Sequence, residues 1–185
     1  ITQAVKYYLS KKKGNVAVNL STTRAVDDVA IEHGCEVFRA PVGEANVVKK
    51  MKEVDAVIGG EGSGGVIIPD VNFGRDALVG TVITLQHLVK ARCKMSTLKK
   101  SMPQYFIVKK KINISSNPDE LLKKLVEKYR SEKINLEDGL RIDFKDHWVH
   151  LRKSNTEPII RCIVEAKSKE DAEKFAEKYI GEIKY

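Results

Sequence analysis

The segment from Arg152 to Arg161 combines the side chains that a phosphate site needs. It holds both of these arginines, three small polar side chains and a proline. Apolar, strand-like sequence lies on both sides, at residues 148–151 and 159–164. A loop between two strands can turn hydroxyls, an amide and backbone N–H groups toward one point, and an arginine at its rim adds charge. The segment therefore predicts an anion-binding nest, although an ordinary polar hairpin with solvated arginines would have the same composition.

A glycine-rich segment, Gly59–Gly65, offers a second kind of chemistry. It lies between short apolar runs at 56–58 and 66–68, and it carries one carboxylate, Glu61, and one hydroxyl, Ser63. Glycines allow positive φ angles and the close approach of a ligand. A carboxylate can accept hydrogen bonds from the paired hydroxyls of a sugar ring. A hairpin turn with a chance glutamate is the alternative interpretation.

Helix and strand patterns alternate in the first half of the chain, which favours an α/β layer with a central, largely parallel sheet. The helix predicted over residues 75–91 is apolar nearly all round and is expected to pack on several sides. The other expected helices are 2–13, 24–33 and 44–54, and the expected strands are 16–20, 35–39, 56–58 and 66–68.

The pattern changes near residue 100. Strand, helix, hairpin, strand and helix then follow one another, which predicts a small α+β domain with an antiparallel sheet. We therefore expect two domains, residues 1–100 and 105–185. The elements expected after residue 94 are helices at 95–102, 117–131 and from 168 onward, and strands at 104–114, 140–144, 148–151 and 159–165.

Composition limits the classes of protein that fit the chain. With 42% hydrophobic and 31% charged residues, its 185 residues can form a core. No apolar run approaches the ~18–20 residues of a transmembrane helix, and residues 1–9 lack the features of a signal peptide. A net charge of +8 could attract nucleic acid or a small anion. However, the lysines are spread out among acids without stacking aromatics, so solvated helix faces account for most of them.

The cysteines and histidines give no metal site. Cys35, Cys93 and Cys162 are odd in number and form no C-x-x-C pair, which predicts a reduced, cytoplasmic protein without a zinc site. His147 and His150 are spaced so that they point to opposite faces of a strand, so they are not expected to share a metal.

In this order, the two motifs make the chain similar to the α-D-phosphohexomutase superfamily of phosphoglucomutases, phosphomannomutases and phosphoglucosamine mutases. Gly60–Gly64 resembles the sugar-binding G-E-x-S-G loop of the family's third domain. Arg152–Arg161 resembles the phosphate-binding R-x-S-G-T-E-P-x-x-R loop of its fourth domain. Asp138–Leu140 with Trp148–Val149 matches the hairpin before that loop, and Pro41–Glu44 resembles a turn that faces the sugar. The resemblance covers essentially the whole chain and implies a mixed-sheet α/β domain, then a small antiparallel α+β domain.

The resemblance implies an intramolecular phosphotransferase. Such enzymes move a phosphoryl group between C1 and C6 of a hexose through a bisphosphorylated intermediate that turns over in the site. One fixed clamp must therefore hold whichever phosphate is not reacting. The resemblance assigns sugar binding to residues 1–100, through Glu61, Ser63 and Gly64. It assigns phosphate binding to residues 105–185, through Arg152, Ser154, Asn155, Thr156 and Arg161.

Two positions depart from the family pattern. Asn155 stands where glycine is usual, but asparagine tolerates a left-handed backbone, so the loop geometry is expected to be kept. Gly65 stands where many members have histidine, so a contact from that histidine to the sugar is missing and the preferred hexose stays open. Arg75 lies close enough to the sugar loop to be a further substrate candidate.

The family's phosphoserine loop, T-x-S-H-N-P, and its magnesium loop, D-G-D-x-D-R, are not in this sequence, and the chain does not begin with Met. We therefore expect the C-terminal half of a mutase, without catalytic residues or metal ligands of its own and inactive alone. Mg²⁺ would belong to the parent enzyme. The expected partners are a hexose phosphate and the N-terminal half of the same enzyme, with no membrane and no nucleic acid.

Two other functions remain open on the sequence. A basic nucleic-acid-binding module would use the net charge of +8 and the small antiparallel domain, and its binding would depend strongly on salt. A scaffold module with degenerate sites would need incomplete motifs, whereas both motifs here are nearly complete.

Overall fold

The computed structural model describes residues 1–114, 117–154 and 157–184. The chain divides into two compact units, Ile1–Gln104 and Tyr105–Tyr185. Buried apolar side chains form separate clusters in the two units, so each unit has its own core.

The first unit is built on a mixed sheet. Its strands are β1 (Val16–Asn19), β2 (Val37–Ala40), β3 (Ile58–Gly60) and β4 (Val66–Ile67). They lie in the order β2–β1–β3–β4. The first three strands are parallel, and β4 runs antiparallel to β3. Helices connect the parallel strands, because such strands cannot be joined by a tight turn.

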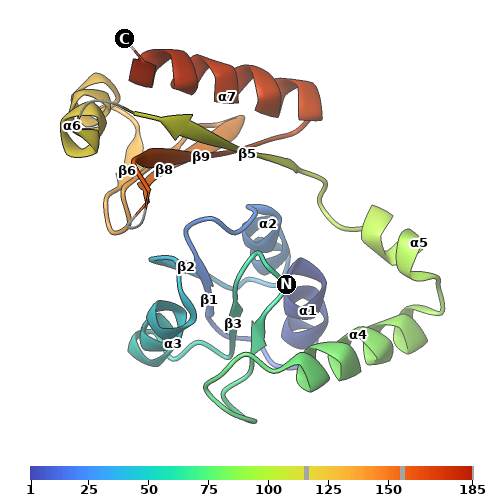
Figure 1. The fold of residues 1–185 in the computed structure, drawn as a ribbon. Helices are drawn as coiled ribbons and strands as arrows, with labels where there is room; N and C mark the ends of the chain where they lie inside the picture. The colour runs from blue at the N-terminus through green and yellow to red at the C-terminus, as the bar shows by residue number, and fades with distance from the viewer. Residues whose placement is uncertain (115–116, 155–156, 185) are drawn as a thin grey trace. The chain divides into compact units, whose positions relative to one another are not determined.

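Helices cover both faces of this sheet (Figure 1). They are α1 (Thr2–Leu9), α2 (Ala25–Glu32), α3 (Glu44–Glu53) and α4 (Ala77–Ala91). The short helix α5 (Met95–Lys100) follows α4 and lies away from the sheet (Figure 1). Val5 of α1, Val29 of α2 and Ile83 of α4 join one cluster of buried side chains. Val47 and Met51 of α3 join the cluster on the opposite face. The carboxyl ends of the parallel strands and the loops that follow them are thereby held between two packed layers.

Helix α4 differs from the expectation. Leu78, Val82, Leu85 and Val89 are each 51–79% exposed, whereas Ile83 is buried. Their spacing places the four exposed side chains on one stripe of the helix, here called the α4 stripe. The prediction that this helix packs on several sides is therefore wrong within the first unit, where the α4 stripe is left uncovered.

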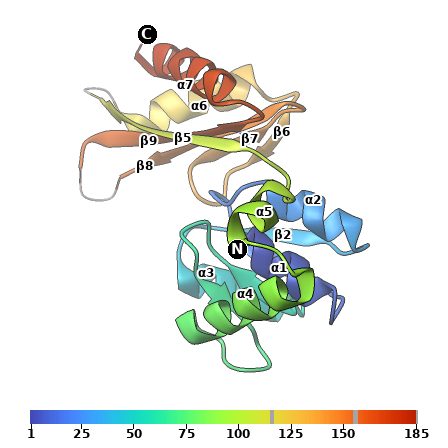
Figure 2. The ribbon, with the colours of Figure 1, turned by 90° about the vertical axis from the view of Figure 1, so that its right-hand side faces the viewer.

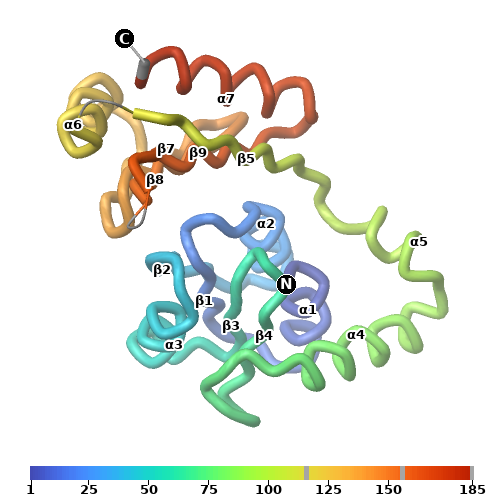
Figure 3. The backbone as a smooth tube through the Cα atoms, viewed as in Figure 1, coloured from blue at the N-terminus to red at the C-terminus, as the bar shows by residue number. Residues whose placement is uncertain are grey.

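The second unit is an antiparallel sheet with two helices. Its strands are β5 (Phe106–Asn113), β6 (Lys133–Asn135), β7 (Leu140–Asp143), β8 (His147–Lys153) and β9 (Ile159–Ala166), and its helices are α6 (Pro118–Lys128) and α7 (Lys169–Lys184). The strand order is β5–β9–β8–β7–β6, and each neighbouring pair is antiparallel. The path of the chain through these strands can be followed in Figure 3.

Both helices of the second unit cover the same face of its sheet (Figure 2). Leu125 of α6 and Tyr179 of α7 pack on Val149, Leu151 and Cys162 of the central strands. Because successive residues of a strand point to opposite faces, the residues between these apolar ones face away from the helices. That second face carries the polar side chains of the hairpin formed by β8 and β9.

The predicted fold class is confirmed: a mixed α/β unit precedes a five-stranded antiparallel unit. One strand was missed in the sequence. The edge strand β6 has three residues, none of them buried, so it shows no run of apolar residues and too little alternation to detect. The predicted helix at 2–13 ends earlier, at Leu9, where Ser10 caps it and its hydroxyl donates to the Tyr7 carbonyl at 2.7 Å.

We predict that Asp76→Ala lowers the free energy of unfolding of the first unit. Oδ1 of Asp76 accepts a hydrogen bond of 2.9 Å from the Val79 N–H and so caps α4. Loss of such a cap costs about 1 kcal/mol, which urea denaturation would measure. The control Glu36→Ala removes an exposed carboxylate outside the helices and should change stability by less than about 0.5 kcal/mol. Equal losses in both variants would contradict the capping role.

Candidate functional site

The predicted sugar loop forms one tight turn between β3 and β4. The Glu61 N–H donates to the Gly65 carbonyl at 3.2 Å, and the Gly64 N–H donates to the Glu61 carbonyl at 3.0 Å. The structure therefore brings Glu61, Ser63 and Gly64 into a single turn. Ser63 and Gly64 are exposed there, whereas Glu61 is 7% exposed.

The Glu61 carboxylate is tied to the scaffold through one of its oxygens. Oε1 accepts from Nδ2 of Asn19 at 2.8 Å and from the Gly43 N–H at 3.1 Å. Asn19 ends β1 and Gly43 precedes α3, so this oxygen joins two connections that are far apart in sequence. Oε2 lies 3.6 Å from Nη1 of Arg75. A ligand hydroxyl that binds Glu61 would therefore donate to Oε2.

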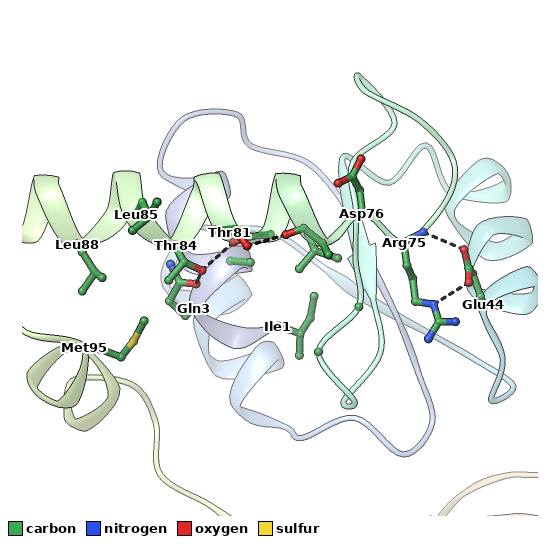
Figure 4. A pocket seen from close by; sticks show the side chains of 16 residues that line it. Ile1, Gln3, Glu44, Arg75, Asp76, Thr81, Thr84, Leu85, Leu88 and Met95 are labelled. Carbon is green, nitrogen blue, oxygen red and sulfur yellow. Dashed lines mark hydrogen bonds and ion pairs between the residues drawn. The ribbon is translucent and has the colours of Figure 1, made fainter.

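Arg75 and Glu44 stand beside this turn. The Arg75 backbone N–H donates to Oε1 of Glu44 at 2.8 Å, and Nε of Arg75 donates to Oε2 at 2.7 Å, as the dashed lines in Figure 4 show. These two hydrogen bonds hold the pKa of Glu44 below its usual value, and the same contact raises the pKa of Arg75. The pair is thus ionised, and the guanidinium is fixed next to the glycine-rich turn.

A cavity of about 750 Å³ opens at this place. Glu44, Gly64, Gly65 and Arg75 are among the residues that line it, and Leu85 and Met95 are among its apolar lining residues (Figure 4). The ionised pair of Glu44 and Arg75 therefore faces open space beside the turn that carries Glu61, although Glu61 itself is not one of the lining residues. Such a polar cavity can hold a ligand rich in hydroxyl groups.

In the second unit, strand register places three cationic side chains in a row. Arg152 of β8 is directly opposite Arg161 of β9, which is opposite Lys111 of β5. Residues directly opposite each other project from the same face of a sheet, and like charges in that arrangement repel. Glu157 offsets part of this charge, since its Oε2 lies 3.6 Å from Nζ of Lys111. An anion bound beside Arg161 of this cation row would relieve the remaining repulsion, so the arrangement suits a phosphate group.

The turn before β7 supports Arg152. Nε of Arg152 lies 2.8 Å from Oδ2 of Asp138, and the Asp138 carbonyl lies 2.7 Å from Nε2 of His150. Gly139 has φ +83°, and a Cβ built on it would lie 2.3 Å from the Leu151 carbonyl oxygen. Glycine is therefore required for the turn to approach β8 and to hold Asp138 beside the arginine.

The remaining predicted phosphate residues lie in the loop between β8 and β9. The Ser154 N–H donates to the Ile159 carbonyl at 2.9 Å, which closes the described part of the hairpin. Asn155 and Thr156 lie outside the described residues. Arg161 is exposed.

Two neighbours of these sites, Asn19 and Lys111, were not identified as such from the sequence. Asn19 does not belong to any recognisable motif. Lys111 was interpreted as one of the solvated lysines of a basic run, because its place beside Arg161 follows only from the pairing of β5 with β9. Trp148 is fully buried, donates from Nε1 to Oε1 of Glu165 at 2.7 Å and has the Arg141 guanidinium 4.4 Å from its ring. This buried polar set lies on the face that carries the cation row.

Comparisons with known proteins agree with this architecture. The profile of the phosphoglucomutase/phosphomannomutase alpha/beta/alpha domain III matches residues 1–106, and that of the phosphoglucomutase/phosphomannomutase C-terminal domain matches residues 92–181. A phosphoglucomutase/phosphomannomutase of Thermococcus kodakarensis is 36% identical over 89% of this chain and 36% of its own length. A probable phosphoglucosamine mutase of Methanopyrus kandleri is 35% identical over 92% of this chain and 38% of its own length.

A solved phosphoglucomutase/phosphomannomutase family structure from Burkholderia thailandensis superposes with a TM-score of 0.79 at 23% identity, over 99% of this chain and 41% of that one. The two units thus have the fold of consecutive phosphohexomutase domains. The chain belongs to the phosphoglucomutase/phosphomannomutase family and corresponds to its C-terminal region. It spans less than two fifths of the length of both curated relatives.

The described residues contain no cluster of three or more His, Cys, Asp or Glu side chains that could hold a metal ion. Within the same residues, no helix combines the length and the apolar character that crossing a membrane requires.

We predict that Gly139→Ala destabilises the second unit. The new Cβ would clash with the Leu151 carbonyl and would force a side chain into a left-handed backbone, which costs about 1 kcal/mol or more before the clash is counted. Gly181→Ala is the matched control, because a Cβ there meets no atom within 4 Å among the described residues. Chemical denaturation of both variants measures the difference, and a stable Gly139→Ala variant would show that the turn does not depend on glycine.

We also predict a pH dependence from His150. Burial lowers the pKa of His150 from 6.5 to about 4, so the unfolded chain takes up a proton at a higher pH than the folded one. The stability contributed by neutral His150 is therefore present above pH 6.5 and is lost as the pH falls toward 4. Between pH 7.5 and 5 this loss is about 2 kcal/mol. Denaturation at both pH values should show a smaller change for His150→Gln, and equal changes would exclude His150 as the cause.

Proposed function

We propose that this chain is the ligand-binding C-terminal region of a phosphohexomutase that interconverts hexose 1-phosphates and hexose 6-phosphates. The cation row formed by Lys111, Arg161 and Arg152 is the observation that carries the proposal. A membrane or a nucleic acid is not required as a partner. The cytoplasm suits a protein whose three cysteines are free.

The two units divide the ligand between them in this proposal. The first unit, with Glu61, Ser63 and Gly64, binds the sugar ring through hydroxyl groups. The second unit, with Arg152, Ser154, Asn155, Thr156 and Arg161, binds the phosphate that is not reacting. Arginine suits this role because its planar fork can donate two parallel hydrogen bonds to a phosphate. The domain boundary proposed for this division is residues 100–105.

The proposed mechanism requires phosphate contacts and sugar contacts that work in two orientations of the ligand. A phosphoryl group passes between C1 and C6 through a bisphosphorylated intermediate, so each end of the sugar must in turn occupy the clamp. Phosphoryl transfer depends mainly on positioning and on electrostatic stabilisation. Arginine contacts to a phosphate serve either end equally, because the phosphate is chemically the same in both orientations. Glu61 can accept hydrogen bonds from sugar hydroxyl groups that occupy similar positions in both orientations of the intermediate.

The groups that transfer the phosphoryl are assigned to the rest of the parent enzyme. The phosphoserine pattern is not in this sequence. The resemblance implies a magnesium ion that would supply electrostatic stabilisation of the transferred phosphoryl group. The described residues offer no fitting set of ligands for it, so this chain contributes no step through the metal. The chain alone should therefore bind ligands without turning them over.

We predict that Arg161→Gln weakens the binding of inorganic phosphate by about 10- to 100-fold, because a charge-assisted hydrogen bond contributes roughly 1.5–3 kcal/mol. Titration of the 185-residue chain, followed by NMR of the backbone amides, would measure it. Arg130→Gln is the matched control, because Arg130 is exposed at the end of α6 and pairs with Glu127.

Three results would count against the proposal. Equal phosphate affinity in Arg161→Gln and Arg130→Gln would remove the cation row from the site. Tight, salt-dependent binding of duplex DNA together with no binding of phosphate would favour the nucleic-acid function instead. Mutase turnover by this chain alone would contradict the division of catalysis between two parts of the parent.

A further inference from the structure

His150 lies on the face of the second sheet that carries the cation row. Residues two apart on a strand project from the same face, so His150 and Arg152 of β8 point to the same side. His150 is directly opposite Arg141 of β7 and Ile163 of β9. Its side chain is fully buried. The cation row thus has a buried histidine as its neighbour along β8.

The ring of His150 is bonded to the turn before β7. Its Nε2 lies 2.7 Å from the carbonyl oxygen of Asp138. A carbonyl can only accept a hydrogen bond, so Nε2 must carry the proton and donate it. Burial lowers the pKa of His150 from 6.5 to about 4, and the contact with Asp138 opposes this only in part. At neutral pH, His150 is therefore an uncharged imidazole that donates from Nε2 and adds no charge to the cation row.

Asp138 connects this hydrogen bond to Arg152. Its carboxylate Oδ2 lies 2.8 Å from Nε of Arg152, while its carbonyl oxygen accepts from His150. The same residue thus contacts two side chains of β8, one through its main chain and the other through its carboxylate. Because the hydrogen bond from His150 fixes the main chain of Asp138, it also limits where the carboxylate can lie.

Arg152 requires such support because of its neighbour in the cation row. Arg161 is directly opposite it, and like charges in that position repel. Without Asp138, the side chain of Arg152 would turn away from Arg161, and the two guanidinium groups would not reach one anion. The ion pair with Asp138 is made at Nε, so it does not use the terminal N–H groups with which an arginine can bind a phosphate.

We propose that His150 is a positioning residue for the phosphate site, which acts through Asp138 on Arg152. It holds the Asp138 carbonyl, so that the carboxylate of the same residue keeps the Arg152 guanidinium beside that of Arg161. His150 itself does not touch the ligand. The inference rests on the proposed function, in which the cation row binds the phosphate that is not reacting. A side chain that only filled the core would need the right volume, whereas a positioning side chain must also donate a hydrogen bond from the right place.

The test is a titration of the 185-residue chain with inorganic phosphate, followed by NMR of the backbone amides. His150→Leu fills a similar volume without a donor and should weaken phosphate binding about 2- to 10-fold, which corresponds to the net contribution of one hydrogen bond. His150→Gln can place its amide N–H near the position of Nε2, so it should restore most of the affinity. The Nε–H resonance of Arg152 should shift in the leucine variant and return toward its original position in the glutamine variant.

A second pair of variants keeps the comparison decisive even where leucine prevents folding. His150→Asn is polar like His150→Gln, but its shorter side chain cannot bring its amide to the position of Nε2. It should therefore bind phosphate as weakly as the leucine variant. Equal affinities in the asparagine and glutamine variants would show that the place of the donor has no effect.

His147→Leu is the matched control. His147 is the other histidine of β8 and is also buried, but it stacks on Phe175 of α7 on the opposite face of the sheet. Its ring is bonded to Asp146 and Tyr179, so its loss should lower stability without changing the phosphate affinity of the folded chain. Urea denaturation of each variant measures stability separately from binding.

A double-mutant cycle shows whether His150 acts through Asp138. Asp138→Asn keeps the main-chain carbonyl and removes the charge that holds Arg152. If the two residues act in one chain of contacts, His150→Leu should have little further effect on phosphate affinity in this background.

The possible outcomes separate the positioning role from the proposed function. Unchanged phosphate affinity in His150→Leu, or equal losses in His150→Leu and His147→Leu, would overturn the positioning role and leave the proposed function standing. An effect of His150→Leu that is the same with and without Asp138→Asn would also overturn it. A wild-type chain that binds no phosphate would contradict the proposed function itself, and the positioning role with it.

Discussion

The buried carboxylate of Glu61 is the constraint on which the first unit depends. A charge that is 7% exposed is costly unless hydrogen bonds and an opposite charge compensate it. Asn19 and the Gly43 N–H supply the hydrogen bonds, and Arg75 supplies the charge. These three partners come from the end of β1, the start of α3 and the approach to α4. The same interaction that satisfies Glu61 therefore also fixes the loops around the cavity.

The second unit, in contrast, holds like charges close to one another on one face of its sheet. Strand register brings Lys111, Arg161 and Arg152 side by side, and Asp138 offsets part of their repulsion through its ion pair with Arg152. Register has a period of two residues, so a shift by one would send these side chains to the helix-covered face. The apolar residues between them, which pack on α6 and α7, prevent that shift. The core thus defines which face can attract an anion.

The sequence predicted the features that depend on local pattern. The alternation of helices and strands gave the mixed sheet, and the order around the Asp138–Leu140 hairpin gave the antiparallel unit. Contacts between distant segments could not be predicted in this way. Asn19 is 42 residues from Glu61, and Lys111 joins the cation row only through strand pairing. The α4 stripe was misjudged because an apolar helix looks the same in sequence whether or not other parts of its unit cover it.

The α4 stripe has a consequence for local motion. With Leu78, Val82, Leu85 and Val89 turned to solvent, α4 gains less from packing than the strands do. Its β-branched residues also lower its intrinsic helix propensity. The backbone amides of α4 should therefore exchange with solvent at a lower opening free energy than those of β1, which is buried at every position. Because Arg75 lies just before the first turn of this helix, an opening at that end would release the arginine from Glu44 while the sheet stays intact.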